Sequence, residues 1–163
     1  MIKKTIPFIC LPFLFLILSG FICGETNSIE LMSTDGDYVR TQSFKGKVVV
    51  VSWWATWCKP CLQELKFLSK MKKKYNDALI VVAVSTDGPE TISAVNTIIR
   101  SKRLDNLIVL IDREGSTNPL GQLPYSIYLN RDGLQCSEHS GFISGDEDSI
   151  EKKIKGLINE EKK

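Results

Sequence analysis

The sequence predicts an α/β domain with a central mixed sheet flanked by helices. Two long apolar runs, 48–54 and 79–85, are continuous rather than alternating, which is typical of central strands buried on both faces. A pattern of apolar residues three or four apart follows each run, and it predicts a helix in each case. Strands separated by helices favour parallel pairing with right-handed crossovers. The sheet is therefore expected to have a parallel centre.

Turn signals and periodicity place the remaining elements. Asp35-Gly36 separates two short runs with β-branched or aromatic residues, which favours an N-terminal hairpin over 30–44. The second helix is expected to begin at Asp87, an N-cap residue type. The other expected elements are a strand over 107–112, a hairpin over 125–140 that adds an antiparallel edge, and an amphipathic helix over 146–163.

Residues 1–24 differ from the 25–163 domain that follows. Lys3 and Lys4 precede an apolar run, and no further charge occurs until Glu25. A short positive region before an apolar run is typical of an export signal. The domain is therefore expected outside the cytoplasm, in the periplasm or at the outer face of the cell membrane.

Three fates fit this segment. Cleavage after a small residue, near Gly20 or Gly24, gives an exported protein. Retention gives a membrane anchor, since about 20 apolar residues span a bilayer. Lipidation of Cys23 gives a lipoprotein, although the bulky Ile22 precedes it.

Composition excludes several classes of protein. The chain has 163 residues, 21 Lys plus Arg and 19 Asp plus Glu, so its formal charge is +2. Lys3 and Lys4 account for that excess, and a neutral domain gives no electrostatic case for nucleic-acid binding. Five cysteines are too few and odd in number for a disulfide-scaffold mini-protein.

The chemical centre is Cys58-Lys59-Pro60-Cys61, between the first long strand and its helix. Free N–H groups at a helix N-terminus stabilise a thiolate, so Cys58 is expected to be the exposed nucleophile. Cys61, one turn further, is expected to resolve the mixed disulfide. Lys59 would favour the thiolate further, and Pro60 is tolerated in the first turn of a helix.

Other chemistry at these cysteines is less well supported. A zinc site needs about four ligands, and the domain offers only Cys136 and His139, both in the C-terminal hairpin. Haem attachment needs a histidine after the second cysteine, where Leu62 stands. We therefore expect no metal and no cofactor. A static disulfide is the remaining alternative, and Cys136 is interpreted as a packing residue.

The segment from Trp54 to Cys61, with Glu64, resembles the thioredoxin superfamily. More narrowly, residues 29–160 resemble the extracytoplasmic, membrane-tethered TlpA/ResA-like thiol–disulfide oxidoreductases. This resemblance implies a thioredoxin-like fold with an N-terminal β-hairpin and a central helix–strand insertion.

The resemblance also assigns roles to residues. Pro124 matches a proline that follows a cis peptide bond and exposes the backbone of Leu123 for pairing with a bound polypeptide. Glu64 matches a glutamate that handles protons near the cysteines, and Trp57 is expected to flank the active site. Ser52 departs from thioredoxin itself, which has a buried aspartate there. Glu64 is more relevant for that reason.

The sequence therefore predicts a monomeric oxidoreductase that reduces client protein disulfides. The resemblance implies a membrane thiol–disulfide electron donor, and clients such as apocytochrome c haem-site cysteines in cytochrome c maturation. A disulfide oxidant or isomerase, and a client-binding module without turnover, are the alternatives.

Overall fold

Strand β3 (Val48–Trp54) is an inner strand of a seven-stranded sheet in the computed structural model, which describes residues 23–24 and 28–160. The strand order is β2-β1-β5-β4-β3-β6-β7. The other strands are β1 (Glu30–Ser33), β2 (Tyr38–Arg40), β4 (Leu79–Ser85), β5 (Ile108–Ile111), β6 (Tyr125–Leu129) and β7 (Gln135–Ser140). The α-helices are α1 (Lys59–Tyr75), α2 (Ile92–Lys102) and α3 (Asp146–Asn159).

The sheet has the predicted mixture of parallel and antiparallel strands. β3 pairs in parallel with β4, which pairs in parallel with β5. The N-terminal hairpin, β1 and β2, adds antiparallel strands beside β5, and the C-terminal hairpin, β6 and β7, adds them beside β3. The α/β fold class predicted from the sequence is confirmed.

Both faces of β3 are buried, as its continuous apolar run predicts. Val48, Val50 and Trp54 join the core under the helices, whereas the alternate residues Val49 and Trp53 join the core on the opposite face. This alternation follows from the two-residue period of a strand.

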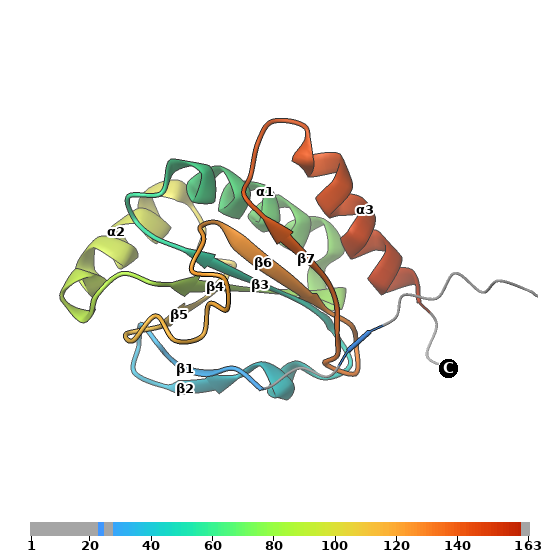
Figure 1. Ribbon diagram of the computed structural model, residues 1–163, viewed down its shortest axis with the longest axis horizontal. Helices are drawn as coiled ribbons and strands as arrows, with labels where there is room; N and C mark the ends of the chain where they lie inside the picture. Colours follow the sequence, from blue (N-terminus) through green and yellow to red (C-terminus); the bar gives the residue numbers. More distant parts are fainter. Residues whose placement is uncertain (1–22, 25–27, 161–163) are drawn as a thin grey trace, which may run out of the picture.

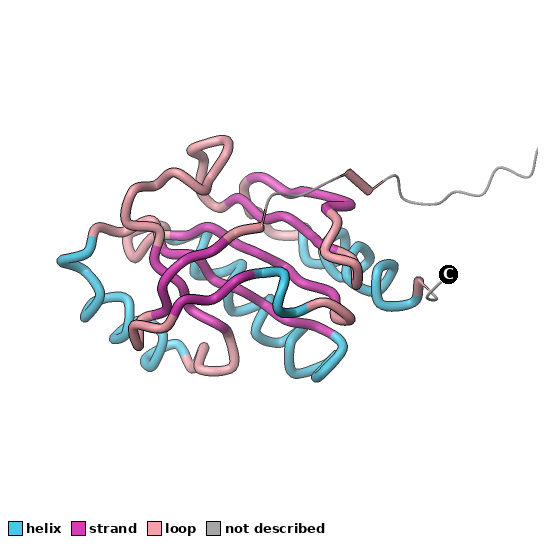
Figure 2. The backbone as a smooth tube through the Cα atoms, turned by 90° about the horizontal axis from the view of Figure 1, so that it is seen from below, coloured by secondary structure: helices cyan, strands magenta, loops and turns pink. Residues whose placement is uncertain are grey.

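The two faces are covered by different elements. The three α-helices of the described residues all lie on one face, as Figures 1 and 2 show from two directions. The opposite face packs against the N-terminal hairpin and the residue Phe44 that follows it. Helices α1 and α2 share a face because two successive right-handed crossovers proceed in the same direction along the sheet.

Two predicted helix boundaries shift. The helix expected from Asp87 begins at Ile92, after a 3₁₀ turn over Pro89–Thr91, and Asp87 does not cap it. The carboxylate of Asp87 is instead used by the loop before α1, as described below. Helix α3 ends at Asn159, and the predicted end at 163 lies outside the described residues.

The interpretation of Cys136 as a packing residue was wrong. Cys136, in β7, forms a disulfide bond with Cys23, 113 positions away in the sequence. The Gly24 N–H donates to the carbonyl of Gln135 at 2.8 Å, and this isolated antiparallel bridge brings the two cysteines together. The domain therefore has a disulfide in addition to the Cys58–Cys61 pair.

The predicted export segment lies outside the described residues, except for Cys23 and Gly24. Within the part of the chain that the structure describes, no helix combines the length and apolar character needed to cross a membrane.

Candidate redox site at the start of helix α1

The cysteine pair lies where the sequence predicts it. β3 ends at Trp54, and α1 begins at Lys59 with Cys58 as its N-cap. Cys58 and Cys61 form a disulfide bond with an S–S distance of 2.00 Å. The backbone N–H of Cys61 donates to Cys58 Sγ at 3.3 Å. The sulfur that would carry the negative charge therefore faces a free N–H group of the helix N-terminus.

Cys58 was expected to be exposed, but only 6% of its surface is accessible. The disulfide bond turns its sulfur inward toward Cys61, which is fully buried. The relative order is as predicted, because Cys58 is the more accessible of the two sulfur-bearing residues. Around the pair, Trp57 is 74% exposed, and Lys59 and Pro60 are also exposed.

The loop before the pair is fixed by Asp87, which follows β4. Its buried carboxylate accepts hydrogen bonds from the Thr56 N–H at 2.8 Å and the Thr56 hydroxyl at 2.7 Å. The Ser85 hydroxyl donates to the same carboxylate at 2.8 Å. Sequence reasoning missed this role and treated Asp87 as a helix cap. One feature of the sequence could have indicated this role. Asp87 comes just after the buried strand β4, which pairs in parallel with β3, so both strands end at the same edge of the sheet.

The predicted proline loop lies at the same end of the sheet. The Leu123–Pro124 peptide bond is cis, as the family resemblance implied. Tyr125, the next residue, pairs with Trp53 near the end of β3. The carbonyl of Pro124 is used within the fold, since it accepts the Gly141 N–H at 2.8 Å. Leu123 is partly buried against both cores.

Glu64 lies one helical turn beyond Cys61 and is fully buried. Its carboxylate accepts hydrogen bonds from the hydroxyl of Ser52 at 2.9 Å and that of Ser126 at 2.8 Å. Burial raises the pKa of Glu64 to about 7, although the two hydroxyl donors act in the opposite direction, and nearby Asp146 raises it slightly more. A carboxyl with this pKa exchanges protons near neutral pH.

Apolar side chains are exposed around this end of the sheet. Trp57 is 74% exposed, Ile143, after β7, 72%, and Leu120, before the cis proline, 51%. All three follow or precede strand ends that lie next to one another. A surface of this kind suits an apolar polypeptide segment better than a small polar substrate.

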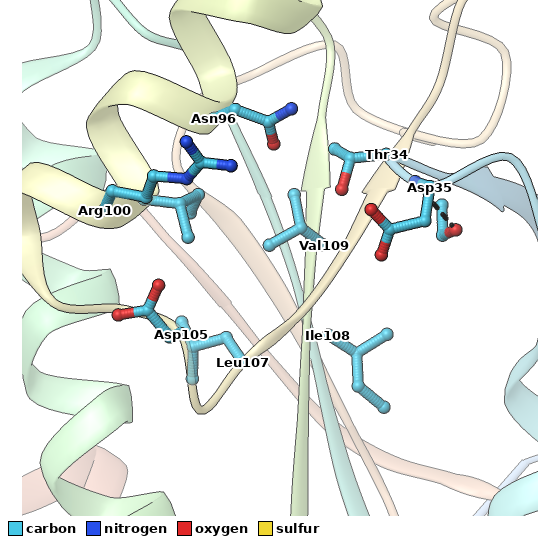
Figure 3. Close-up of a pocket in the computed structure, with 10 residues that line it drawn as sticks. Thr34, Asp35, Asn96, Arg100, Asp105, Leu107, Ile108 and Val109 are labelled. Atoms are coloured by element: carbon cyan, nitrogen blue, oxygen red, sulfur yellow. Dashed lines mark hydrogen bonds between the residues drawn. The ribbon is translucent and has the colours of Figure 1, made fainter.

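The hollow in Figure 3 lies elsewhere. It has a volume of about 360 Å³ and is bordered by α2, β5 and the turn after β1. Its lining side chains include both positive and negative charges: Arg100 and Asp105 lie on one side of the hollow and Asp35 on the other. None of the cysteines that the structure describes lines it, Cys58 and Cys61 included, so the exchange chemistry does not take place in this hollow.

Comparison with known proteins identifies the family. The Redoxin family model matches residues 24–123. This chain belongs to the redoxin family. The thioredoxin-like protein YneN of Bacillus subtilis is 32% identical to this redoxin over 123 residues, which cover 74% of the chain and 72% of YneN. The thiol-disulfide oxidoreductase ResA of Bacillus thuringiensis is 29% identical over 120 residues, or 72% of the chain and 68% of ResA.

Solved structures agree with this assignment. A putative thiol:disulfide interchange protein DsbE from Chlorobium tepidum has a TM-score of 0.76 and 26% identity to this redoxin, covering 84% of the chain and 97% of its own. The exposed lipoprotein thioredoxin Etrx1 of Streptococcus pneumoniae has a TM-score of 0.66 and 28% identity. The match covers 80% of this chain and 100% of Etrx1. The predicted thioredoxin-like, TlpA/ResA-like family is confirmed, and the redoxin is a thiol–disulfide oxidoreductase.

The buried carboxyl gives a testable pH dependence. The raised pKa means that the folded protein binds more protons than the unfolded chain between about pH 4.5 and pH 7. The contribution of Glu64 to stability is therefore greatest below this range and falls as pH rises through it, by roughly 3 kcal/mol. In Glu64→Gln this loss should disappear. Urea unfolding of the oxidised protein at pH 4.5 and pH 8 measures it.

Glu160→Gln, at an exposed glutamate beyond α3, is the matched control and should keep the wild-type dependence. Parallel wild-type and Glu64→Gln stability curves would show that folding leaves the pKa of Glu64 at its usual value, contrary to its burial.

Proposed function

We propose that this redoxin reduces disulfide bonds of exported proteins outside the cytoplasm. The observation that carries the proposal is the Cys58–Cys61 pair at the helix N-terminus, beside the cis Leu123–Pro124 bond and exposed Trp57. A polypeptide lying along the cis-proline loop would present its disulfide to Cys58. Similarity to proteins named ResA and to the DsbE-like structure supports thiol–disulfide exchange and the extracytoplasmic location.

The exchange proceeds in two substitutions at sulfur. The Cys58 thiolate attacks one sulfur of the client disulfide, forms a mixed disulfide and releases the first client thiolate, which takes a proton from solvent. Cys61 then loses its proton and attacks Cys58 Sγ, which closes the Cys58–Cys61 disulfide and releases the second client thiolate. Two electrons pass from the redoxin to the client. A membrane thiol–disulfide carrier would return the redoxin to its dithiol form.

Glu64 would accept the proton of Cys61 in the second substitution. Both residues are fully buried and lie one turn apart on α1, so water is a poor proton acceptor for this thiol. A carboxyl with a pKa of about 7 is ionised often enough to take the proton and can later return it. Ser52 and Ser126 would hold the carboxylate in place.

The client class follows from the exposed geometry. Cys58 is only 6% accessible in the oxidised protein, so a client disulfide in an extended segment reaches it better than one in a folded core. Closely spaced cysteines of an unfolded apocytochrome c haem site meet this requirement. We propose them as the client, in cytochrome c maturation, with the thiols of copper sites as a related class.

Trapping of the mixed disulfide tests the proposed roles. Cys61→Ser removes the resolving thiol, so clients should accumulate in disulfide-linked adducts through Cys58. Non-reducing electrophoresis and mass spectrometry of exported proteins measure the adducts and name the clients. Cys58→Ser is the matched control and should form few. Adducts that require Cys61 instead of Cys58 would overturn the roles.

The reduction potential tests the direction. A reductant of client disulfides should have a Cys58–Cys61 potential near that of thioredoxin, about −270 mV. Equilibration with glutathione or dithiothreitol of known poise measures it. A potential near that of the strong oxidant DsbA, about −120 mV, would exclude the reductase and favour the oxidant.

The proton role of Glu64 predicts a pH profile. In wild type, the rate at which Cys61 releases a trapped client should rise with pH through about 7, as Glu64 ionises. In Glu64→Gln the rate at pH 7 should fall by roughly a hundredfold or more, because general-base catalysis contributes on that order. Stopped-flow release of a labelled peptide measures both, with Glu160→Gln as control. An unchanged profile in Glu64→Gln would exclude Glu64 as the proton acceptor.

A further inference from the structure

The second disulfide bond fixes the start of the domain to the outer strand of the sheet. Cys23 is bonded to Cys136, and Gly24 bridges to Gln135. The side-chain amide of Asn130 lies 3.7 Å from Cys23 Sγ and donates to it. β7 is the edge strand of the sheet, so these contacts cover part of an otherwise unpaired edge.

This bond restricts what can happen to the export segment. A cysteine sulfur that carries a thioether-linked lipid cannot form a disulfide, and cleavage after Gly24 would remove Cys23 from the chain. We infer that Cys23 stays in the exported protein as the disulfide partner of Cys136, and that this bond attaches the end of the export segment to the sheet at the end opposite the active site. The inference rests on the proposed extracytoplasmic location but not on the direction of exchange.

Bond formation needs an external oxidant. The thiols of Cys23 and Cys136 together lose two protons and two electrons as their S–S bond forms. A disulfide-bearing oxidant of exported proteins takes the electrons by dithiol–disulfide exchange and leaves as a dithiol. Such oxidants act outside the cytoplasm, where structural disulfides persist.

The strand registers place the two disulfides at opposite ends of the sheet. Gln135 pairs with Leu129, and Leu129 pairs with Val49, near the start of β3. The Cys58–Cys61 pair follows Trp54, at the other end of β3. Val49 and Trp54 are five positions apart along β3, a distance of roughly 17 Å. Figure 1 shows the bridge beside β7 and the loop before α1 on opposite sides of the molecule.

This placement has a consequence for an anchored chain. Any segment that precedes Cys23 leaves the domain at the end remote from Cys58. If that segment stays in a membrane, the active site faces away from the bilayer and toward soluble clients. The attachment thus orients the domain.

The surroundings of this bond suit a permanent crosslink. Cys136 lies in a strand, and no helix of the described residues begins at Cys136 or at Cys23, so none of these helices offers N–H groups to stabilise a thiolate there. The bond also closes a loop over 113 positions, and long loops gain most from closure. Cys58–Cys61 is expected to exchange, and Cys23–Cys136 to persist.

Peptide mapping of the exported full chain tests the inference. The protein is exported in a bacterial host, treated with a low concentration of dithiothreitol, alkylated and digested. We expect alkylated Cys58 and Cys61, and a disulfide-linked peptide that contains Cys23 and Cys136. A lipid on Cys23, an N-terminus beyond Gly24, or free thiols at Cys23 and Cys136 would each overturn it.

Stability of the same exported protein provides a second measurement. Cys136→Ser should lower the melting temperature by roughly 10 °C, and Cys23→Ser should lower it equally. The double variant should show no further fall, because either change removes the same bond. If Cys136 only packs in the protein, Cys23→Ser will leave the melting temperature unchanged, and the inference fails.

Insulin-disulfide reduction separates this inference from the proposed function. Both serine variants should reduce insulin within about twofold of the wild-type rate, since the crosslink lies away from Cys58. A large loss of activity in variants that remain folded at the assay temperature would show that the second disulfide takes part in exchange, which contradicts a permanent crosslink. A wild-type protein that has the Cys23–Cys136 bond but does not reduce insulin would instead contradict only the proposed reductase.

Discussion

The backbone N–H of Cys61 donates to Cys58 Sγ at 3.3 Å, and the remaining features of the site are arranged around this interaction. It exists because β3 ends at Trp54 and α1 begins at Lys59, which leaves Cys58 at the N-cap. The first N–H groups of a helix have no partner within the helix, so a sulfur placed there is stabilised most when it is charged. β3 is held by β4 and β6 on either side. Asp87 then fixes Thr56 in the connecting loop.

The buried carboxylate of Glu64, one turn into α1, destabilises the fold when it is ionised. The pairing of β3 with β6 reduces this destabilisation, because it brings two hydroxyl donors to the carboxylate. Ser52 and Ser126 are directly paired across β3 and β6, so both hydroxyls face α1 and reach Glu64. These two donors are neutral, and they do not offset the burial of a full negative charge. The pKa of Glu64 therefore stays near 7 rather than falling to the range of a salt-bridged carboxyl. With two neutral serine donors, Glu64 can still take up and release a proton near neutral pH. A positively charged partner such as arginine would have kept the carboxyl ionised.

Local patterns predicted most of the fold and the reactive pair, because these depend on residues close in sequence. The apolar run of β3 and the position of Cys58 before a helix are examples. The cis bond before Pro124 came only through family resemblance, since a single X-Pro pair does not reveal its isomer. The role of Asp87 and the Cys23–Cys136 bond were missed for a different reason. Each joins segments that only the sheet topology brings together, across 31 and 113 positions respectively.

The two disulfide bonds of the described residues serve different purposes because their surroundings differ. When Cys58–Cys61 opens, both cysteines remain in place, since β3 and α1 position them without the bond. When Cys23–Cys136 opens, residues 23–24 keep only one backbone hydrogen bond to β7 among the backbone contacts of the described residues. The reducing carrier proposed above would have to act on the first bond without reaching the second. Val49 and Trp54, the residues of β3 on the side of each bond, are roughly 17 Å apart along the strand, so a carrier docked at the start of α1 would restore the dithiol and leave the attachment of the domain intact.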